Sequence, residues 1–166
     1  KLVALLATRI GSKLDYQKIG VLLGLSRHKI RDYIQLFEAT YLLHLIGPYS
    51  GSTDRHIAMQ PKLYLADTGL VNQFAQVSSG ALFENAIALQ LLRNGKVHYF
   101  QKKTGQEIDF IWNENTAIEV KETPSPSDLK TLNERAQAIG IDRTILIGRY
   151  PPGVPFSDFI WGGCAF

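Results

Sequence analysis

Four residues in the second half of the chain have the types and spacing of a metal-dependent hydrolytic site: Glu84, Asp109, Glu119 and Lys121. Side chains alternate across a strand, so Glu119 and Lys121 share one face of the segment 116–121 while Val120 points into the core. The rest of this segment is apolar, which predicts a buried strand. Because an unpaired charge is costly in such a place, Glu119 and Lys121 are expected to have a specific role there.

Asp109 lies on the preceding predicted strand, 107–112, and a turn at 113–115 joins the two strands as antiparallel neighbours. Counting outward from the turn places Asp109 nearly opposite Glu119, with their Cβ atoms about 5 Å apart. Two carboxylates at that distance repel each other unless a cation lies between them. Hard divalent ions take oxygen ligands, so Asp109 and Glu119 are predicted to hold Mg²⁺ or Mn²⁺.

The other two residues complete a catalytic set. Glu84 lies one turn into a predicted helix, whose N-terminus can bring a third carboxylate to the strands. Lys121 can orient an attacking water or neutralise charge that builds up on a phosphate. Glu107 shares the face of Asp109 and is a candidate for a residue that contacts the metal ligands rather than the metal. Gln101, at the end of the strand 96–101, can also reach the site. A Glu-x-Lys pair is common on protein surfaces, so the prediction depends on the joint order of helix, strand and strand.

The elements that must position these residues form an α/β domain over residues 79–166. Its predicted elements are a helix over 81–94, strands over 96–101, 107–112 and 116–121, a helix over 127–138 capped by Ser127, and a strand over 143–148. The helical crossover from the third strand to the fourth is right-handed if those strands are parallel.

Residues 1–78 are predicted to form a separate helical domain. Helices are expected over 1–10, after Asp15, and from Arg27 to about Tyr41, with Ser26 as N-cap of the last. Two helices joined by a short turn that contains Gly24 form a helix-turn-helix pattern. The first turn of its second helix offers four basic side chains to nucleic acid: Arg27, His28, Lys29 and Arg31. A three-helix bundle with solvated charges, or a protein-binding module, is the alternative.

Two strands, 42–49 and 57–65, follow these helices, with a turn at 51–54 between them. Three helices followed by such a hairpin form a winged helix, in which the turn is the wing. Arg55 and His56 would lie at the base of the wing, where Arg55 can contact a DNA backbone. The chain as a whole is therefore predicted to be α+β, with a winged helix-turn-helix domain before an α/β domain.

Composition narrows the class of protein. The chain has 166 residues, a net charge of +3 and a mild basic excess, which fits a nucleic-acid partner without requiring one. Its single cysteine, Cys164, excludes an internal disulfide and suits a reducing, cytoplasmic setting. No membrane span or signal peptide is visible. The first residue is Lys1 rather than Met, so we expect the chain to be part of a longer polypeptide.

The motif Asp109, followed by Glu119-Val120-Lys121, resembles the PD-(D/E)xK motif of restriction-endonuclease-like nucleases, whose αβββαβ core matches the predicted order. The chain departs from that motif at Ile108, which stands where the proline is expected. Nearly the whole chain is also similar to the C-terminal region of a family of bacterial and archaeal AAA-type ATPases. The segments that carry this resemblance are 15–16, 25–27, 36–42, 48–50, 61–70 and 82–85.

The resemblance implies an N-terminal P-loop ATPase followed by a winged helix and a nuclease-like domain. No GxxxxGK[ST] sequence occurs here, so no ATP site is expected in this chain. The implied partners are DNA and the protein's own ATPase domain, and homo-oligomerisation is compatible with them. The alternatives are an inactive nuclease-like module for DNA binding, protein interaction or oligomerisation, and a transcription regulator that uses the winged helix alone.

Overall fold

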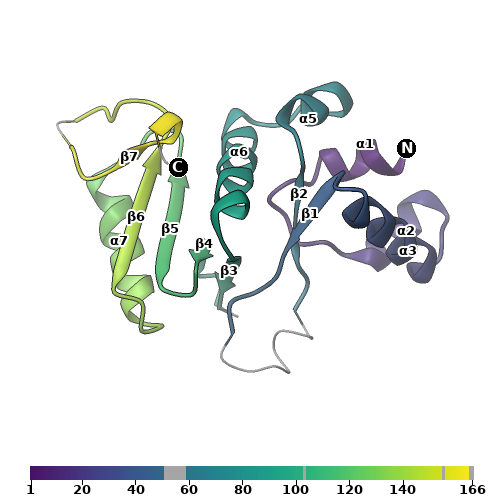
Figure 1. Ribbon diagram of the computed structural model, residues 1–166, viewed down its shortest axis with the longest axis horizontal. Coiled ribbons are helices and arrows are strands. Elements are labelled where there is room, and N and C mark those ends of the chain that lie inside the picture. Colours follow the sequence, from purple (N-terminus) through teal and green to yellow (C-terminus); the bar gives the residue numbers. More distant parts are fainter. Residues whose placement is uncertain (51–58, 103, 155, 165–166) are drawn as a thin grey trace.

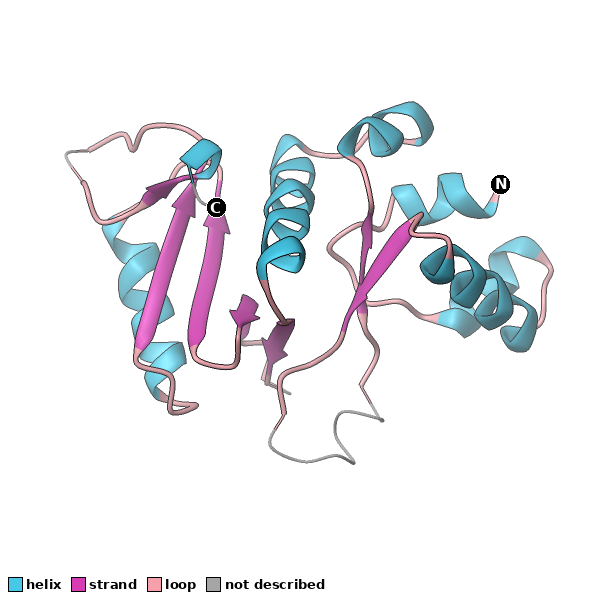
Figure 2. Ribbon diagram, in the orientation of Figure 1, coloured by secondary structure: helices cyan, strands magenta, loops and turns pink. Residues whose placement is uncertain are grey.

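The computed structural model describes residues 1–50, 59–102, 104–154 and 156–164 and is a mixed α/β structure with two sheets (Figures 1 and 2). The predicted wing at 51–54, together with Arg55 and His56, lies outside the described residues. No helix in the part of the chain that is described combines the length and apolar character needed to cross a bilayer.

Three helices open the N-terminal part: α1 (Leu2–Ala7), α2 (Tyr16–Leu23) and α3 (Arg27–Ala39). The predicted caps are present, because the Asp15 side chain accepts the backbone N–H groups of two residues in α2 and the Ser26 hydroxyl accepts that of Lys29. Gly24 ends α2 with a left-handed φ of 67°. The first helix is shorter than predicted, since it ends at Ala7, and its C-cap residue Thr8 turns its hydroxyl back onto the Leu5 carbonyl.

A small antiparallel sheet of β1 (Leu43–Ile46) and β2 (Lys62–Leu65) follows, and α5 (Thr68–Phe74) comes after it. Both strands are shorter than predicted, for identifiable reasons. Beyond Ile46 the chain leaves β1 and pairs with the second sheet instead, and β2 begins directly after Pro61, which has no N–H to donate to a ladder. The loop around Ser12 runs along the other side of β2 and exchanges backbone hydrogen bonds with Leu63.

The second sheet has the order β3–β4–β5–β6–β7. Its elements, with the helices between them, are α6 (Ser79–Asn94), β3 (Val97–Gln101), β4 (Glu107–Trp112), β5 (Thr116–Lys121), α7 (Pro126–Gln137), β6 (Arg143–Gly148), β7 (Ile160–Trp161) and the short 3₁₀ helix η1 (Gly162–Cys164). The first three strands are antiparallel, and β5, β6 and β7 are parallel. The order of elements from α6 to β6 is therefore the predicted one.

The N-cap of α7 differs from the prediction. Ser125, not Ser127, caps the helix, and the Asp128 carboxylate accepts the Ser125 backbone N–H in a capping box. Pro126 occupies the first helical position, where its missing N–H costs nothing. The N-cap therefore lies two residues earlier than expected.

The two helices α6 and α7 cover opposite faces of the large sheet. Ile87 and Leu91 of α6 pack with Phe110 and Ile118, and Leu132 of α7 packs in a second cluster on the other face. Figure 1 shows α6 between the small sheet and the large one. It therefore faces both sheets, and the core on its side includes Tyr64 from β2.

Hydrogen bonds tie the N-terminal part to helix α6 and to the second sheet. The buried Asn85 side chain of α6 accepts the N–H of Leu65 at 3.0 Å and donates to the Leu65 carbonyl at 2.9 Å. Residues 47–49 pair with the edge strand β3. The Tyr99 N–H donates to the Gly47 carbonyl at 3.0 Å, and the Tyr99 carbonyl accepts the Tyr49 N–H. The predicted boundary at 78/79 falls at the start of α6, and the packing runs across it.

Candidate functional site

The site begins where β4 and β5 part. Their ladder runs from Trp112↔Thr116 to Phe110↔Ile118. One residue further on, the Asp109 carboxylate accepts the Val120 backbone N–H at 2.9 Å, in place of a strand-to-strand bond. On its other side β4 has a bulge: three residue steps from Ile108 to Ile111 face two steps from His98 to Phe100. Bulges redirect side chains, and this one lies at Asp109.

Asp109 is partly buried, and the loss of hydration that follows is the largest influence on the pKa of its carboxyl group. Burial raises the pKa of its carboxyl group, while Lys62, the Val120 N–H and Lys121 oppose the rise. A buried carboxylate that stays ionised needs a positive charge or several donors. The environment of Asp109 is therefore one that a cation would stabilise.

Glu119 and Lys121 lie together on β5, as predicted. The Lys121 ammonium donates to Glu119 Oε1 at 2.7 Å. Glu119 is only 7% exposed, and its second oxygen, Oε2, is buried without a hydrogen-bond partner among the described residues. Burial and the charge of Asp109 raise the pKa of Glu119. A buried carboxylate oxygen without a donor is uncommon in folded proteins, and here it belongs to a predicted metal ligand.

Glu84 reaches the same region from the first turns of α6. Its Oε1 accepts the Tyr64 hydroxyl at 2.7 Å and lies 3.7 Å from the Lys62 ammonium. Gly11, with φ of 71°, packs against it so closely that a Cβ there would lie 3.0 Å from Oε1. Burial, followed by the charge of Asp109, raises the pKa of Glu84 to about 7. The structure thus brings Glu84, Asp109, Glu119 and Lys121 into one electrostatically connected group.

Lys62 of β2 is the member that the sequence reasoning missed. It is 4% exposed and forms ion pairs with Glu84 and Glu107, and its ammonium lies over the Tyr99 ring at 5.6 Å. Burial lowers its pKa, but Glu84 and Asp109 raise it more, so the net pKa is raised and the ammonium stays charged. The available signal was a lysine inside an otherwise apolar strand, since a buried lysine is almost always paired.

Two further predicted residues lie at the border of the group. Glu107 contacts Lys62, and its carbonyl oxygen accepts from Arg135 of α7 at 2.6 Å. Gln101 is the ladder partner of Glu107 at the end of β3. Glu107 therefore lies next to the predicted ligands, whereas Gln101 is placed beside Glu107 on the neighbouring strand.

We call these side chains the carboxylate cluster: Glu84, Glu107, Asp109, Glu119, Lys62 and Lys121. If all are ionised, four negative and two positive charges give the cluster a net charge of −2. Arg135 near Glu119 and Asp128 near Lys121 have opposite signs and leave this count unchanged. One divalent cation would neutralise the cluster.

A metal would have to be held by few protein ligands. Within the described ranges, no group of three or more His, Cys, Asp or Glu side chains has a geometry that could hold a metal ion. Mg²⁺ commonly keeps several waters and binds through one or two carboxylates. The Asp109–Glu119 pair, with the unpartnered Glu119 oxygen, fits that mode of binding.

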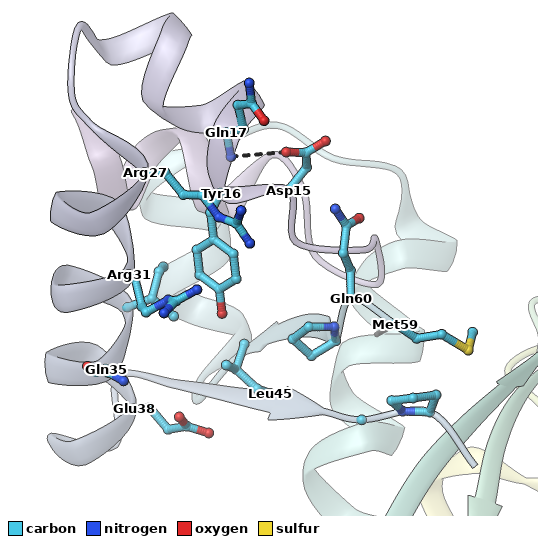
Figure 3. A pocket seen from close by; sticks show the side chains of 14 residues that line it. Asp15, Tyr16, Gln17, Arg27, Arg31, Gln35, Glu38, Leu45, Met59 and Gln60 are labelled. Atoms are coloured by element: carbon cyan, nitrogen blue, oxygen red, sulfur yellow. Dashed lines mark hydrogen bonds between the residues drawn. The ribbon is translucent and has the colours of Figure 1, made fainter. Parts of the chain in front are cut away.

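The predicted nucleic-acid residues separate into two groups. Figure 3 shows Arg27 and Arg31 from α3 beside Tyr16, where they line a cavity of about 710 Å³ between α3 and the chain around β1 and β2. His28 and Lys29 are exposed on α3 but are not among the residues described as lining this cavity; the Lys29 ammonium lies over the Tyr33 ring at 5.7 Å. Gln60 and Pro61, which directly precede Lys62, also line the cavity.

Comparisons with known proteins place the chain among proteins of undefined function. Residues 1–81 match the family model "Domain of unknown function (DUF8612)", and residues 79–160 match "Domain of unknown function (DUF4143)". The two matches meet at the start of α6, next to the predicted domain boundary.

A curated relative is "Uncharacterized protein MJ1544" of Methanocaldococcus jannaschii, which is 28% identical over 134 residues. The match covers 74% of this chain, and the chain spans about 30% of the length of that relative. No solved structure matches the chain significantly.

Proposed function

Starting from a chain whose two parts match domains of unknown function, we propose that it is a metal-dependent phosphodiesterase that acts on DNA. The single observation that carries this proposal is the Asp109–Glu119 pair, in which the buried Glu119 Oε2 has no donor among the described residues and Lys121 lies beside Glu119. The αβββαβ order from α6 to β6 supports a restriction-endonuclease-like core. With all six groups ionised, the carboxylate cluster has a net charge of −2, which supports binding of one divalent ion.

Each residue has a role that its contacts allow. Asp109 and Glu119 hold Mg²⁺ or Mn²⁺, which when bound polarises the phosphate and lowers the pKa of water. Lys121, held at 2.7 Å from Glu119 Oε1, neutralises the charge that develops on the phosphate or orients the attacking water. Glu84 of α6 helps Asp109 and Glu119 to hold the metal, either directly or through a water molecule.

The N-terminal part guides DNA to this site as a winged helix. Arg27 and Arg31 face the cavity beside α3 and contact backbone phosphates, while His28 and Lys29 extend the basic surface. In the longer polypeptide the chain would follow a P-loop ATPase domain, which would remodel the DNA. The partial coverage of the archaeal relative is consistent with such a longer protein.

The test is a cleavage assay with purified protein, Mn²⁺ or Mg²⁺, and either supercoiled plasmid or labelled single-stranded DNA. Wild type should cut, EDTA should abolish cutting, and Lys121→Ala should reduce the rate by at least about 100-fold, as expected for loss of charge stabilisation at a reacting phosphate. Lys130→Ala, which changes an exposed lysine on α7, is the matched control and should cut like wild type. If Lys121→Ala cuts as fast as wild type, or wild type does not cut, the catalytic proposal fails.

A second function, a non-catalytic module that binds a partner protein, is favoured by one observation. Apolar side chains of α2 and α3 are strongly exposed: Val21 is 79% exposed, Leu22 61% and Leu36 54%. A module of this kind would bind DNA or protein without cutting, and EDTA would not affect the binding. Light scattering of wild type and Val21→Ser would show whether this surface supports self-association.

A further inference from the structure

Lys62 occupies the centre of the acidic side of the cluster. Its ammonium contacts Glu107 Oε1 and lies 3.7 Å from Glu84 Oε1, and the charge of Asp109 also acts on it. A third side of the ammonium is covered by the Tyr99 ring, in a cation–π arrangement. One fixed positive charge is thus shared among three carboxylates.

The backbone keeps Lys62 in this place. Lys62 pairs with Ile46 in the small sheet and forms a bridge with Lys13 on its other side, so β2 is held from both edges. Three residues further on, both polar backbone groups of Leu65 are bonded to Asn85 of α6. Because α6 also carries Glu84, the strand and the acid are held relative to each other.

A second metal ion would need the carboxylates that Lys62 already uses. Two-metal sites in nucleases hold their ions about 3.5–4 Å apart and need carboxylates for each. Glu84 Oε1 is engaged by both the Tyr64 hydroxyl and Lys62, and Glu107 Oε1 is engaged by Lys62. The unpartnered oxygen belongs to Glu119 on β5, the strand next to β4, which carries Asp109.

We propose that the Lys62 ammonium takes the place of a second metal ion, so that the carboxylate cluster binds a single divalent cation, at Asp109 and Glu119. This inference rests on the proposed function, because it requires a metal at that pair. It makes Lys62 a positioning residue, which holds Glu84 and Glu107 in ion pairs at the place that a second metal ion would occupy. A strand of the N-terminal part thereby determines how many ions the C-terminal part can hold.

The test counts bound Mn²⁺ in metal-stripped protein by electron paramagnetic resonance of the free ion during titration. Wild type should bind one Mn²⁺ at saturation. Lys62→Met removes the ammonium but keeps the apolar stem, and it should bind two. Lys62→Arg keeps the charge and should bind one. Lys13→Met is the matched control, since Lys13 also lies over the Tyr99 ring but forms no ion pair with a described residue, and it should bind one.

The outcomes separate the two proposals. Two ions on wild type would overturn the role of Lys62 and leave the proposed function standing, whereas no bound ion would overturn both. One ion on both wild type and folded Lys62→Met would show that Lys62 does not exclude a second ion. If Lys62→Met does not fold, as judged by circular dichroism, Lys62→Gln takes its place. A single ion on that variant would refute the inference, as would two ions on Lys62→Arg.

Discussion

Replacing Glu84 by glutamine should stabilise the metal-free protein at neutral and alkaline pH. The pKa of Glu84 is raised to about 7 by burial and then by the charge of Asp109, against the opposing effects of Lys62 and the Tyr64 hydroxyl. Glutamine has the same shape and keeps an oxygen that can accept the Tyr64 hydroxyl. It removes a negative charge that the folded protein, without metal, holds at a cost.

The size and sign follow from the two pKa values. The native carboxyl group titrates near 7 and the unfolded one near 4.5, so between these pH values the native state binds more protons than the unfolded state. The free energy of unfolding of wild type should therefore fall as pH rises through this window and become level above it. At about 1.36 kcal/mol per pKa unit, the full loss is about 3 kcal/mol. Glu84→Gln should escape that loss.

Urea denaturation followed by tryptophan fluorescence, in EDTA at several values from pH 5 to pH 8.5, measures the effect. Glu84→Gln should exceed wild type by about 3 kcal/mol at pH 8 and by less than about 1 kcal/mol at pH 5. Glu134→Gln, which changes an exposed acid on α7, is the matched control and should follow wild type throughout. If the Glu84→Gln and wild-type profiles run parallel from pH 5 to pH 8.5, the electrostatic account of this site is wrong.

Two further predictions concern the contact between the parts of the chain and the route of DNA. Asn85→Ala leaves the N–H and carbonyl of Leu65 without their buried partner, so the free energy of unfolding in urea should drop by about 2–4 kcal/mol. A drop below about 1 kcal/mol would contradict the view that these two bonds, the Asn85 clamp, hold β2 against α6. Arg31→Ala should weaken DNA binding and reduce the slope of log affinity against log salt by about 1 in fluorescence anisotropy, whereas the exposed Arg143→Ala on β6 should leave the slope unchanged.

Local signals in the sequence were sufficient for most elements. Strands 107–112 and 116–121 were predicted with their observed bounds, because a tight turn separates two apolar segments. Asp15 and Ser26 were recognised as caps because a short side-chain acceptor precedes a helical apolar pattern. Ser125 was missed because Ser127, in the first turn of that helix, has the same side chain, and Pro126 between them tolerates the first helical position.

Interactions between distant segments were the part that sequence could not supply. The opposition of Asp109 and Glu119 could be counted from a turn, but the bulge in β4 depends on β3, whose pairing leaves no mark in the sequence of β4. Lys62 meets Glu84 and Glu107 only after β2 has packed beside α6. The metal itself, the DNA contacts and the activity stay predictions.

The clamp that Asn85 forms on β2 has a consequence for dissecting the protein. A fragment cut at residue 79 would contain all four acids of the carboxylate cluster but neither Lys62 nor the Tyr64 ring that packs against Phe110. Such a fragment would expose apolar surface and carry surplus negative charge, so it should be a poor folding unit. A chimeric protein that joined residues 79–166 to a different N-terminal domain would need another cation in the place of the Lys62 ammonium. A new neighbour would therefore have to supply a positive charge beside Glu84 and Glu107.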